Sequence, residues 1–332
     1  MSVDGLPLER GASGDAVRDL HQRLAAVGFA SAGPEVTVFT DATAAALRRF
    51  QAHRGLIVDG RCGPDSWTAL VEAGYRLGDR LLYLRRPMVR GDDVAELQRR
   101  LGALGFDAGR VDGIFGPDTE RALKDFQRNT ALTTDAVCGP DVLAALDRLG
   151  AKADGPANVA GVREREKRGR APRELAGQRI ALAELGGVAT LVQQLGAALH
   201  RSGAIIQITA DLEHAAHAAA ANDFDAELFV GLAVSPDASA RVAYYSTAGF
   251  ESIGGHQFAQ LLSQHCREDE ALPITGMRLG LLRETRMPAV VVHLRPSPNT
   301  SSTREGAPPP AVAALAAHAA AAIAAWVEDP PV

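Results

Sequence analysis

Residues 111–119 read Val-Asp-Gly-Ile-Phe-Gly-Pro-Asp-Thr, and this stretch decides how the first part of the chain folds. Glycine and aspartate favour tight turns, and Pro117 is of the residue type best tolerated in the first turn of a helix. Ala122, Leu123 and Phe126 then follow at helical spacing. The stretch therefore predicts a turn that leads directly into an amphipathic helix.

The first 150 residues contain this pattern twice. Leu20, Leu24 and the Gly-Phe pair at 28–29 recur 77 positions later, and the second copy is one residue shorter between that pair and the turn. The other repeated residues are Phe39, Phe50-Gln51, Asp59 and Cys62-Gly63-Pro64-Asp65 in the first copy, and Phe115, Phe126-Gln127, Asp135 and Cys138-Gly139-Pro140-Asp141 in the second. Self-similarity at a fixed offset sets the architecture. We expect two small helical modules in tandem, at residues 10–76 and 86–150.

The second copy resembles the peptidoglycan-binding domain of bacterial wall hydrolases. The resemblance rests on its Gly-Phe pair at 105–106, its Asp-Gly-x-Phe-Gly-Pro turn at 112–117 and its Ala-Leu-x-x-Phe-Gln helix. The first copy has diverged, since residues 38–41 read Val-Phe-Thr-Asp where that turn is expected. The resemblance implies an all-α module that binds glycan or stem peptide. Most of the motif residues form the fold, so a structural or protein-docking use of the modules is an equal alternative.

Composition limits the classes of function. The 332 residues are 46% hydrophobic, which is enough for packed cores, and the net charge of −5 argues against nucleic acid as a main partner. No run of 18 apolar residues occurs, so we expect no transmembrane segment. The N-terminal residues lack the pattern of a secretory signal, and the chain has only three cysteines. These features predict a cytoplasmic protein.

Residues 151–175 have the composition of a linker. They lack hydrophobic periodicity, and the run from Arg163 to Arg173 contains six basic residues and two acids together with glycine and proline. We expect a solvated tether here. A docking site for an acidic partner or a membrane surface is the alternative.

Residues 176–329 alternate between strand and helix patterns. We expect strands at 179–182, 204–209, 227–232, 242–246 and 289–294, and helices at 187–202, before 222, at 253–266 and in the Ala-rich stretch 311–326. Such alternation is typical of a mostly parallel sheet covered by helices. The whole chain is therefore predicted to be multidomain, with two all-α modules followed by an α/β domain.

The order of these elements resembles the zinc-dependent N-acetylmuramoyl-L-alanine amidases, which cut between muramic acid and the stem peptide. The similar phrases are Ala-Gly-Gln-Arg-Ile at 176–180, Asp-Ala-Glu-Leu-Phe-Val-Gly-Leu at 225–232, Arg-Glu-Thr-Arg-Met-Pro-Ala-Val-Val-Val at 283–292, and Asn299. With the two modules, the resemblance covers nearly the whole chain. The chain is most similar to actinobacterial amidase-like proteins that have the same order of domains.

The resemblance places the family's zinc chemistry on residues that do not suit it. A hydrolytic zinc site needs about three protein ligands and a carboxylate that moves protons. The turn that holds the family's first histidine ligand is replaced by Ala-Glu-Leu-Gly-Gly at 183–187, in which Glu184 is the candidate for the family's glutamate ligand. Ala233 stands at the third ligand, and His293 stands at the catalytic glutamate. We expect no metal, no catalytic residue and no cofactor at these degenerate positions.

A rebuilt zinc site is the alternative. His214 and His217 are spaced i, i+3 and can share one face of a helix. The further candidate ligands are His200, His256, His265 and His293. In this interpretation zinc is the cofactor, and the protein is an active amidase that hydrolyses peptidoglycan.

The degenerate site predicts a pseudoenzyme of cell wall biogenesis. We expect it to bind a peptidoglycan fragment or precursor and to sense or regulate precursor synthesis. The resemblance implies a partner among the cytoplasmic cell-wall synthesis enzymes, with the enolpyruvyl transferase as the candidate. A passive wall-binding protein is a third hypothesis.

Overall fold

The computed structural model describes residues 5–31, 33, 36–150, 159–235, 239–247, 250–266, 272–296 and 310–329. The chain divides into two compact units, Met1–Val162 with Thr247–Phe250, and Arg163–Ser246 with Glu251–Val332. Each unit is described by itself below.

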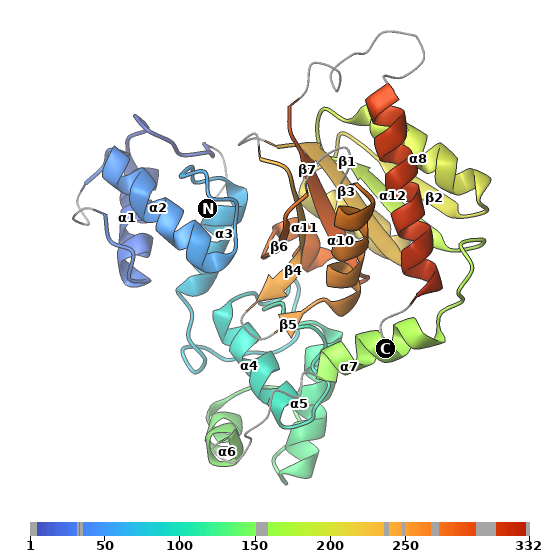
Figure 1. Ribbon diagram of the computed structural model, residues 1–332. Helices are drawn as coiled ribbons and strands as arrows, with labels where there is room; N and C mark the ends of the chain where they lie inside the picture. The colour runs from blue at the N-terminus through green and yellow to red at the C-terminus, as the bar shows by residue number, and fades with distance from the viewer. Residues whose placement is uncertain are drawn as a thin grey trace. The chain divides into compact units, whose positions relative to one another are not determined.

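The first unit contains the two predicted helical modules (Figure 1). The first module consists of α1 (Asp15–Ala26), α2 (Asp41–Arg54) and α3 (Pro64–Ala73), and the second of α4 (Asp92–Ala103), α5 (Pro117–Asn129) and α6 (Pro140–Gly150). Each module has its own core of buried leucine and phenylalanine side chains. Helix α5 begins at Pro117 after an extended Gly116, which confirms the turn and helix predicted at 111–126.

A buried glutamine holds the turn of the second module. Gln98 on α4 is 2% exposed, and its Nε2 donates to Asp112 Oδ1 (2.9 Å), to the Ile114 carbonyl oxygen (3.1 Å) and to Thr119 Oγ1 (3.1 Å). Its Oε1 accepts from the backbone N–H groups of Asp112 (3.1 Å) and Gly113 (2.8 Å). One side chain therefore satisfies the backbone of the tight turn that precedes α5.

A histidine takes this position in the first module. His21 is 1% exposed, and its Nδ1 lies 2.9 Å from the Val36 carbonyl oxygen while its Nε2 lies 2.9 Å from Thr43 Oγ1. Because a carbonyl oxygen only accepts, Nδ1 carries the proton. The imidazole links the Val36 carbonyl oxygen to Thr43 on α2, so a different side chain holds this stretch in the first module, which lacks the Asp-Gly-x-Phe-Gly sequence.

Part of the expected tether is helical. Residues 159–170 form α7 (Val159–Arg170), which corrects the prediction of a solvated linker for this stretch. The Glu164 carboxylate accepts hydrogen bonds from Ser252 Oγ (2.9 Å) and from the N–H groups of Ile253 (3.2 Å) and Gly254 (3.0 Å). These groups open helix α10, where a carboxylate is favoured by the orphan N–H groups and the helix dipole.

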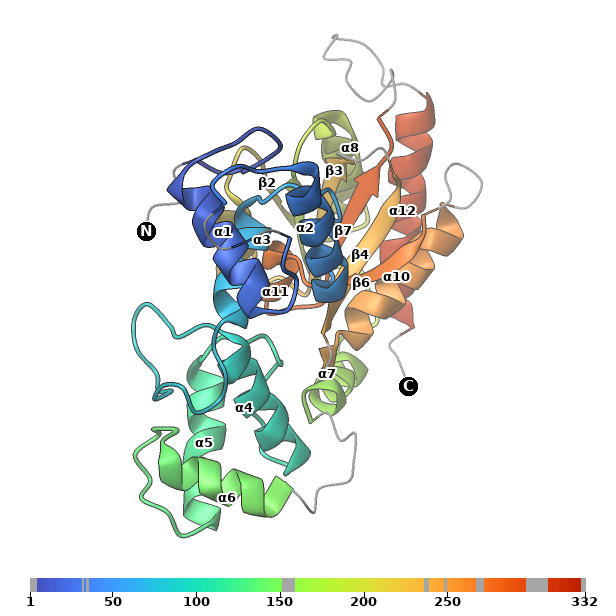
Figure 2. The same cartoon turned by 90° about the vertical axis from the view of Figure 1, so that its left-hand side faces the viewer.

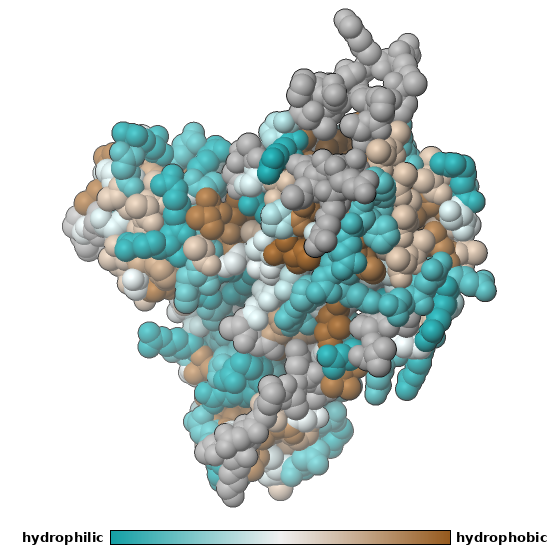
Figure 3. Space-filling model, in the orientation of Figure 1, coloured by the Kyte–Doolittle hydropathy of each residue, from teal (hydrophilic) through white to brown (hydrophobic). Residues whose placement is uncertain are grey.

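Arg168, one turn further along α7, is buried against Trp326. Its guanidinium carbon lies 3.4 Å from the indole centroid, and Nη2 donates to the Trp326 carbonyl oxygen (2.7 Å) and to Gln257 Oε1 (3.1 Å). Burial lowers the pKa of Arg168 to about 10, although Glu164 and Asp329 oppose this shift. Helix α7 therefore belongs to the second unit from Arg163 onward. Figure 3 shows hydrophilic and hydrophobic residues interspersed over the face of the molecule that Figure 1 presents.

The second unit is an α/β domain, as predicted. Its strands are β1 (Arg179–Glu184), β2 (Ile205–Thr209), β3 (Leu228–Val234), β4 (Arg241–Thr247), β5 (Phe250–Glu251), β6 (Ile274–Met277) and β7 (Ala289–Leu294). Its further helices are α8 (Ala189–Arg201), α9 (His214–Asp223), α10 (Ile253–His265), α11 (Gly280–Glu284) and α12 (Pro310–Glu328). Strands β5 and β6 and the short α11 were not predicted.

The sheet order is β2-β1-β3-β7-β4-β5, and β6 pairs with β4. The ladders of β1 with β2, β1 with β3, β3 with β7 and β4 with β6 are parallel, whereas β4 runs antiparallel to β7. The sheet is thus mixed but mostly parallel. Helices α8, α10 and α12 cover one face, and α9 and α11 cover the other (Figures 1 and 2).

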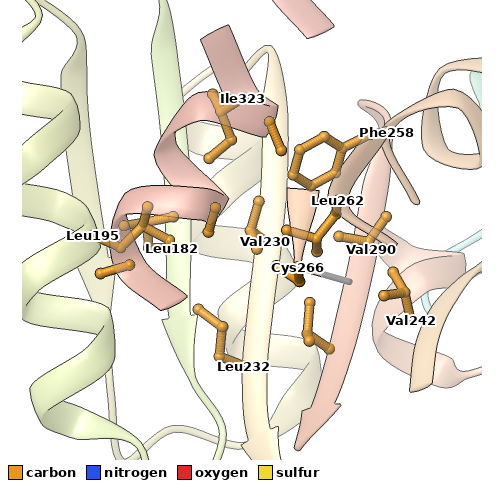
Figure 4. Packing of buried hydrophobic residues seen from close by; sticks show 14 of the residues in the cluster. Leu182, Leu195, Val230, Leu232, Val242, Phe258, Leu262, Cys266, Val290 and Ile323 are labelled. Carbon is orange, nitrogen blue, oxygen red and sulfur yellow. The ribbon is translucent and has the colours of Figure 1, made fainter. Parts of the chain in front are cut away.

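The main core lies between the sheet and α8, α10 and α12. Alternate residues of the central strands, such as Leu182, Val230 and Val290, point into it and meet Phe258 and Ile323 from the helices (Figure 4). A cavity of about 10 Å³ inside this core has only apolar lining, so it is too small and too dry for a polar ligand. The Ala-rich α12 packs here as predicted, and no helix in the described part of the chain is long and apolar enough to cross a membrane.

Candidate functional site

The predicted site residues lie at the carboxyl ends of β1, β3 and β7, which are neighbours in the sheet. In the ladders, Glu184 is opposite Leu232, and Ala233 is opposite His293. Ligands of open α/β sheets bind at this edge of the strands. The sheet therefore brings the three candidate positions to one edge.

Successive residues of a strand point to opposite faces, and this separates the three side chains. Glu184 is paired with Leu232 and lies on the same face of the sheet as that leucine. His293 is paired with the next residue, Ala233, and both lie on the opposite face. The alanine offers no ligand atom. His293 is buried, with 5% of its surface exposed, and it lies in the ladder between Ala233 and Arg241.

The Glu184 carboxylate is engaged with the backbone of its own loop. Its Oε1 accepts from the N–H groups of Gly186 (3.1 Å) and Val188 (3.0 Å). Gly187, whose φ of 77° lies in the left-handed region, completes the turn that leads into α8. This carboxylate therefore acts as a hydrogen-bond acceptor for the backbone of the loop between β1 and α8.

His214 and His217 lie on α9, as predicted, but in different environments. His214 is exposed, whereas His217 is 1% exposed and its Nδ1 lies 2.6 Å from Thr209 Oγ1 at the end of β2. Burial lowers the pKa of His217, and the neighbouring His214 lowers it further, while a hydrogen bond with the Leu212 backbone and the charge of Glu184 act in the opposite direction. Thr209 is a contact that the sequence analysis missed, because nothing in a lone threonine marks it as a histidine partner.

The remaining histidines lie elsewhere. His200 is exposed on α8, and His265 contacts the Leu261 carbonyl oxygen within α10. His256 pairs with Glu251 (2.6 Å) and stacks on Tyr244 at a ring separation of 4.7 Å. His256 and His265 thus have partners on or next to their own helix, and none of the three is grouped with other possible metal ligands among the described residues.

These residues do not fit the family's zinc site. Among the residues that the structure describes, no group of three or more His, Cys, Asp or Glu side chains is placed to hold a metal ion. A structural or catalytic zinc site takes three or four such ligands. The strand ends supply one carboxylate that is already engaged and one imidazole, with an alanine between them.

Comparisons with known proteins identify the parts. The family model of the peptidoglycan binding domain matches residues 13–70 and 90–146. N-acetylmuramoyl-L-alanine amidase CwlM of Mycobacterium tuberculosis is 33% identical, over 88% of this chain and 82% of its own length. N-acetylmuramoyl-L-alanine amidase CwlL of Bacillus licheniformis is 32% identical, over 44% of this chain and 46% of its own length.

Solved amidases are similar to this chain more distantly. The N-acetylmuramoyl-L-alanine amidase of Clostridium difficile 630 is 13% identical with a TM-score of 0.39, and the match covers 47% of this chain and 99% of that one. The extent and identity of the match to CwlM, together with the two peptidoglycan binding domains, decide the assignment. The chain belongs to the N-acetylmuramoyl-L-alanine amidase family and is related to CwlM.

Proposed function

We propose that this chain is a catalytically degenerate member of the amidase family, which binds a peptidoglycan fragment or precursor and senses or regulates precursor synthesis. The observation that carries the proposal is the set of side chains at the strand ends. By the family resemblance, Ala233 and His293 stand at two of the family's functional positions; the two residues are paired in the sheet, and the Glu184 carboxylate accepts backbone hydrogen bonds. Hydrolysis by this family needs zinc to activate water, and these residues offer no set of ligands for it.

The binding role is assigned to the two modules, because they carry the peptidoglycan binding domain. The regulatory role is proposed because the described residues at the strand ends offer no set of zinc ligands, and the cytoplasmic location stays a prediction of the sequence analysis. A cytoplasmic cell-wall synthesis enzyme is the partner class, with the enolpyruvyl transferase as the candidate that the family resemblance implies. Cell fractionation and reconstitution with that purified transferase test this part directly.

Family membership favours one competing function, that of an active zinc amidase. Zinc content, measured by elemental mass spectrometry on protein purified without chelators, separates the two. We expect far less than one zinc per chain and no release of stem peptide from muropeptides, with or without added zinc. The double variant Ala233→His, His293→Glu restores two family residues and serves as a matched comparison. One zinc per unmodified chain together with stem-peptide release would overturn the proposal.

A further inference from the structure

The two modules differ in the segment that leads into their first helix. In the first module, Leu8 forms an isolated antiparallel β-bridge with Cys62, and the Ala12 carbonyl oxygen accepts a hydrogen bond from the Phe39 N–H. In the second module, Leu82 forms the same kind of β-bridge with Cys138, and the Val89 carbonyl oxygen accepts a hydrogen bond from the Phe115 N–H. We call these two backbone contacts of each module its anchors. Residues 9–11 connect the two anchors in the first module, and residues 83–88 connect them in the second. The second module therefore has three additional residues, and we call residues 83–88 the arm loop.

The arm loop exposes large apolar side chains. Tyr83, Leu84 and Met88 are 42%, 36% and 40% exposed, and the preceding Leu81 and Tyr75 are 55% and 37% exposed. These five are half of the exposed large hydrophobic side chains in the described part of the chain. The corresponding residues 9–11 of the first module are Glu-Arg-Gly. The exposed apolar surface is thus a property of the insertion and of the residues just before it.

The anchors hold the arm loop in place. Leu82 and Val89 are 0% and 2% exposed in the core of the module. Next to them, Arg80 makes a two-pronged ion pair with the buried carboxylate of Asp93 (2.7 and 3.1 Å) and donates to the Arg90 carbonyl oxygen (2.7 Å). A loop fixed at both ends loses little entropy when a ligand binds, so its exposed side chains are prepared for contact.

The loop also carries positive charge. Arg85 and Arg86 are both exposed, in a chain whose net charge is −5. Guanidinium groups recognise carboxylates through paired hydrogen bonds, and tyrosine rings and aliphatic side chains pack on sugar faces and methyl groups. A muramoyl peptide combines these features, because it joins an amino sugar to a peptide that carries carboxylates.

We propose that the arm loop of the second module binds muramoyl peptides, with Arg85 and Arg86 pairing with the peptide carboxylates and with Tyr83 and Met88 contacting the sugar and its methyl groups. This assignment rests on the proposed binding function of the modules. It places the ligand on the second module, because the first lacks the insertion and its side chains.

The test is a calorimetric titration of the full chain with a purified disaccharide pentapeptide. Replacing both arginines (Arg85→Gln, Arg86→Gln) removes two charged partners, and we expect about a hundredfold weaker binding, at about tenfold for each. The pair Tyr83→Ser, Met88→Ser is expected to weaken binding about tenfold. Arg10→Gln is the matched control, since Arg10 occupies the short segment of the first module, and it should leave the affinity unchanged.

The outcomes separate this inference from the function on which it rests. If the unmodified chain binds and the arm-loop variants bind equally well with unchanged thermal unfolding, the arm-loop assignment is wrong and the binding function stands. If the unmodified chain binds no muramoyl peptide, the binding function itself fails. A preference of more than about tenfold for the nucleotide-linked pentapeptide precursor would move the arginines to the pyrophosphate and overturn the carboxylate assignment. A change of oligomeric state on sedimentation of the arm-loop variants would make the loop an interface between copies.

Discussion

Replacing Gln98 by alanine is the sharpest test of how the second module is held together. The substitution removes five hydrogen bonds, but most of the groups left behind keep another partner or reach water. The Ile114 carbonyl oxygen still accepts from the Gly116 N–H, and Thr119 Oγ1 still donates to the Ala108 carbonyl oxygen. The buried N–H of Gly113 loses its acceptor. A hydrogen bond contributes about 0.5–1.5 kcal/mol net, and five are lost while several of the groups keep another partner, so we expect about 3 kcal/mol in total.

Amide hydrogen exchange on the full chain measures this loss where it occurs. A loss of about 3 kcal/mol lowers the protection of the α4 and α5 amides by about a hundredfold, while the amides of α1 and α2 and of the α/β unit keep theirs. Arg99→Gln on the same helix is the control, because Arg99 is half exposed and pairs only with Glu96, so its loss should cost less than about 0.5 kcal/mol. Unchanged protection of α4 in Gln98→Ala would refute the view that the glutamine holds the turn.

Three further outcomes follow from buried groups. Burial lowers the pKa of His217, so the stability it contributes is present above the unfolded value of about 6.5 and is lost as the pH falls. The protection factors of the α9 amides, taken relative to the intrinsic exchange rate at each pH, should therefore fall on acidification, and less so in His217→Gln. Equal pH profiles of the protection factors would contradict this. Burial raises the pKa of Cys138 to about 12, so the stability that the thiol contributes is present below about 8.5 and is lost as the pH rises towards 12. At pH 8 the native thiol should therefore react with an aromatic disulfide reagent at least about a hundredfold more slowly than the thiol of the urea-unfolded chain. Equal rates would show that the thiol is not buried. Glu164→Gln should accelerate tryptic cleavage within α7 about tenfold, because the charged carboxylate makes stronger hydrogen bonds to the start of α10 than a neutral amide does. Glu166→Gln is the control, because Glu166 is exposed, and it should leave the cleavage rate unchanged. Similar rates in both variants would mean that Glu164 does not hold α7 against α10.

The sequence predicted those parts of the fold whose determinants are local. The turn at 111–119 and the helix after it were predicted because glycine, proline and apolar spacing act within a few residues. The duplication was visible for the same reason. The three additional residues of the arm loop were missed because they precede Leu20 and Leu97, where the alignment of the two copies begins. In that preceding segment, the alignment of the two copies is fixed only by the matching hydrogen bonds of Ala12 and Val89.

Long-range contacts account for most of what was not predicted. The α7 helix has a weak apolar pattern, and it is held by contacts from Glu164 to Ser252 and from Arg168 to Trp326 that lie far apart in the chain. At the candidate site, the family resemblance singled out Glu184, Ala233 and His293, and the structure places these residues at the carboxyl ends of neighbouring strands. The sequence did not predict the hydrogen bonds that occupy the Glu184 carboxylate, since these depend on the loop geometry.

The closure of each module on itself has an evolutionary consequence. A residue near the start of each module forms a β-bridge with the cysteine two positions before its third helix, Leu8 with Cys62 and Leu82 with Cys138. Each copy thus completes its own core, and stability changes at distant independent sites add without coupling. After duplication, one copy can accumulate substitutions without lowering the stability of its sibling. His21 in one copy and Gln98 in the other are two solutions to the same turn, reached along separate mutational paths.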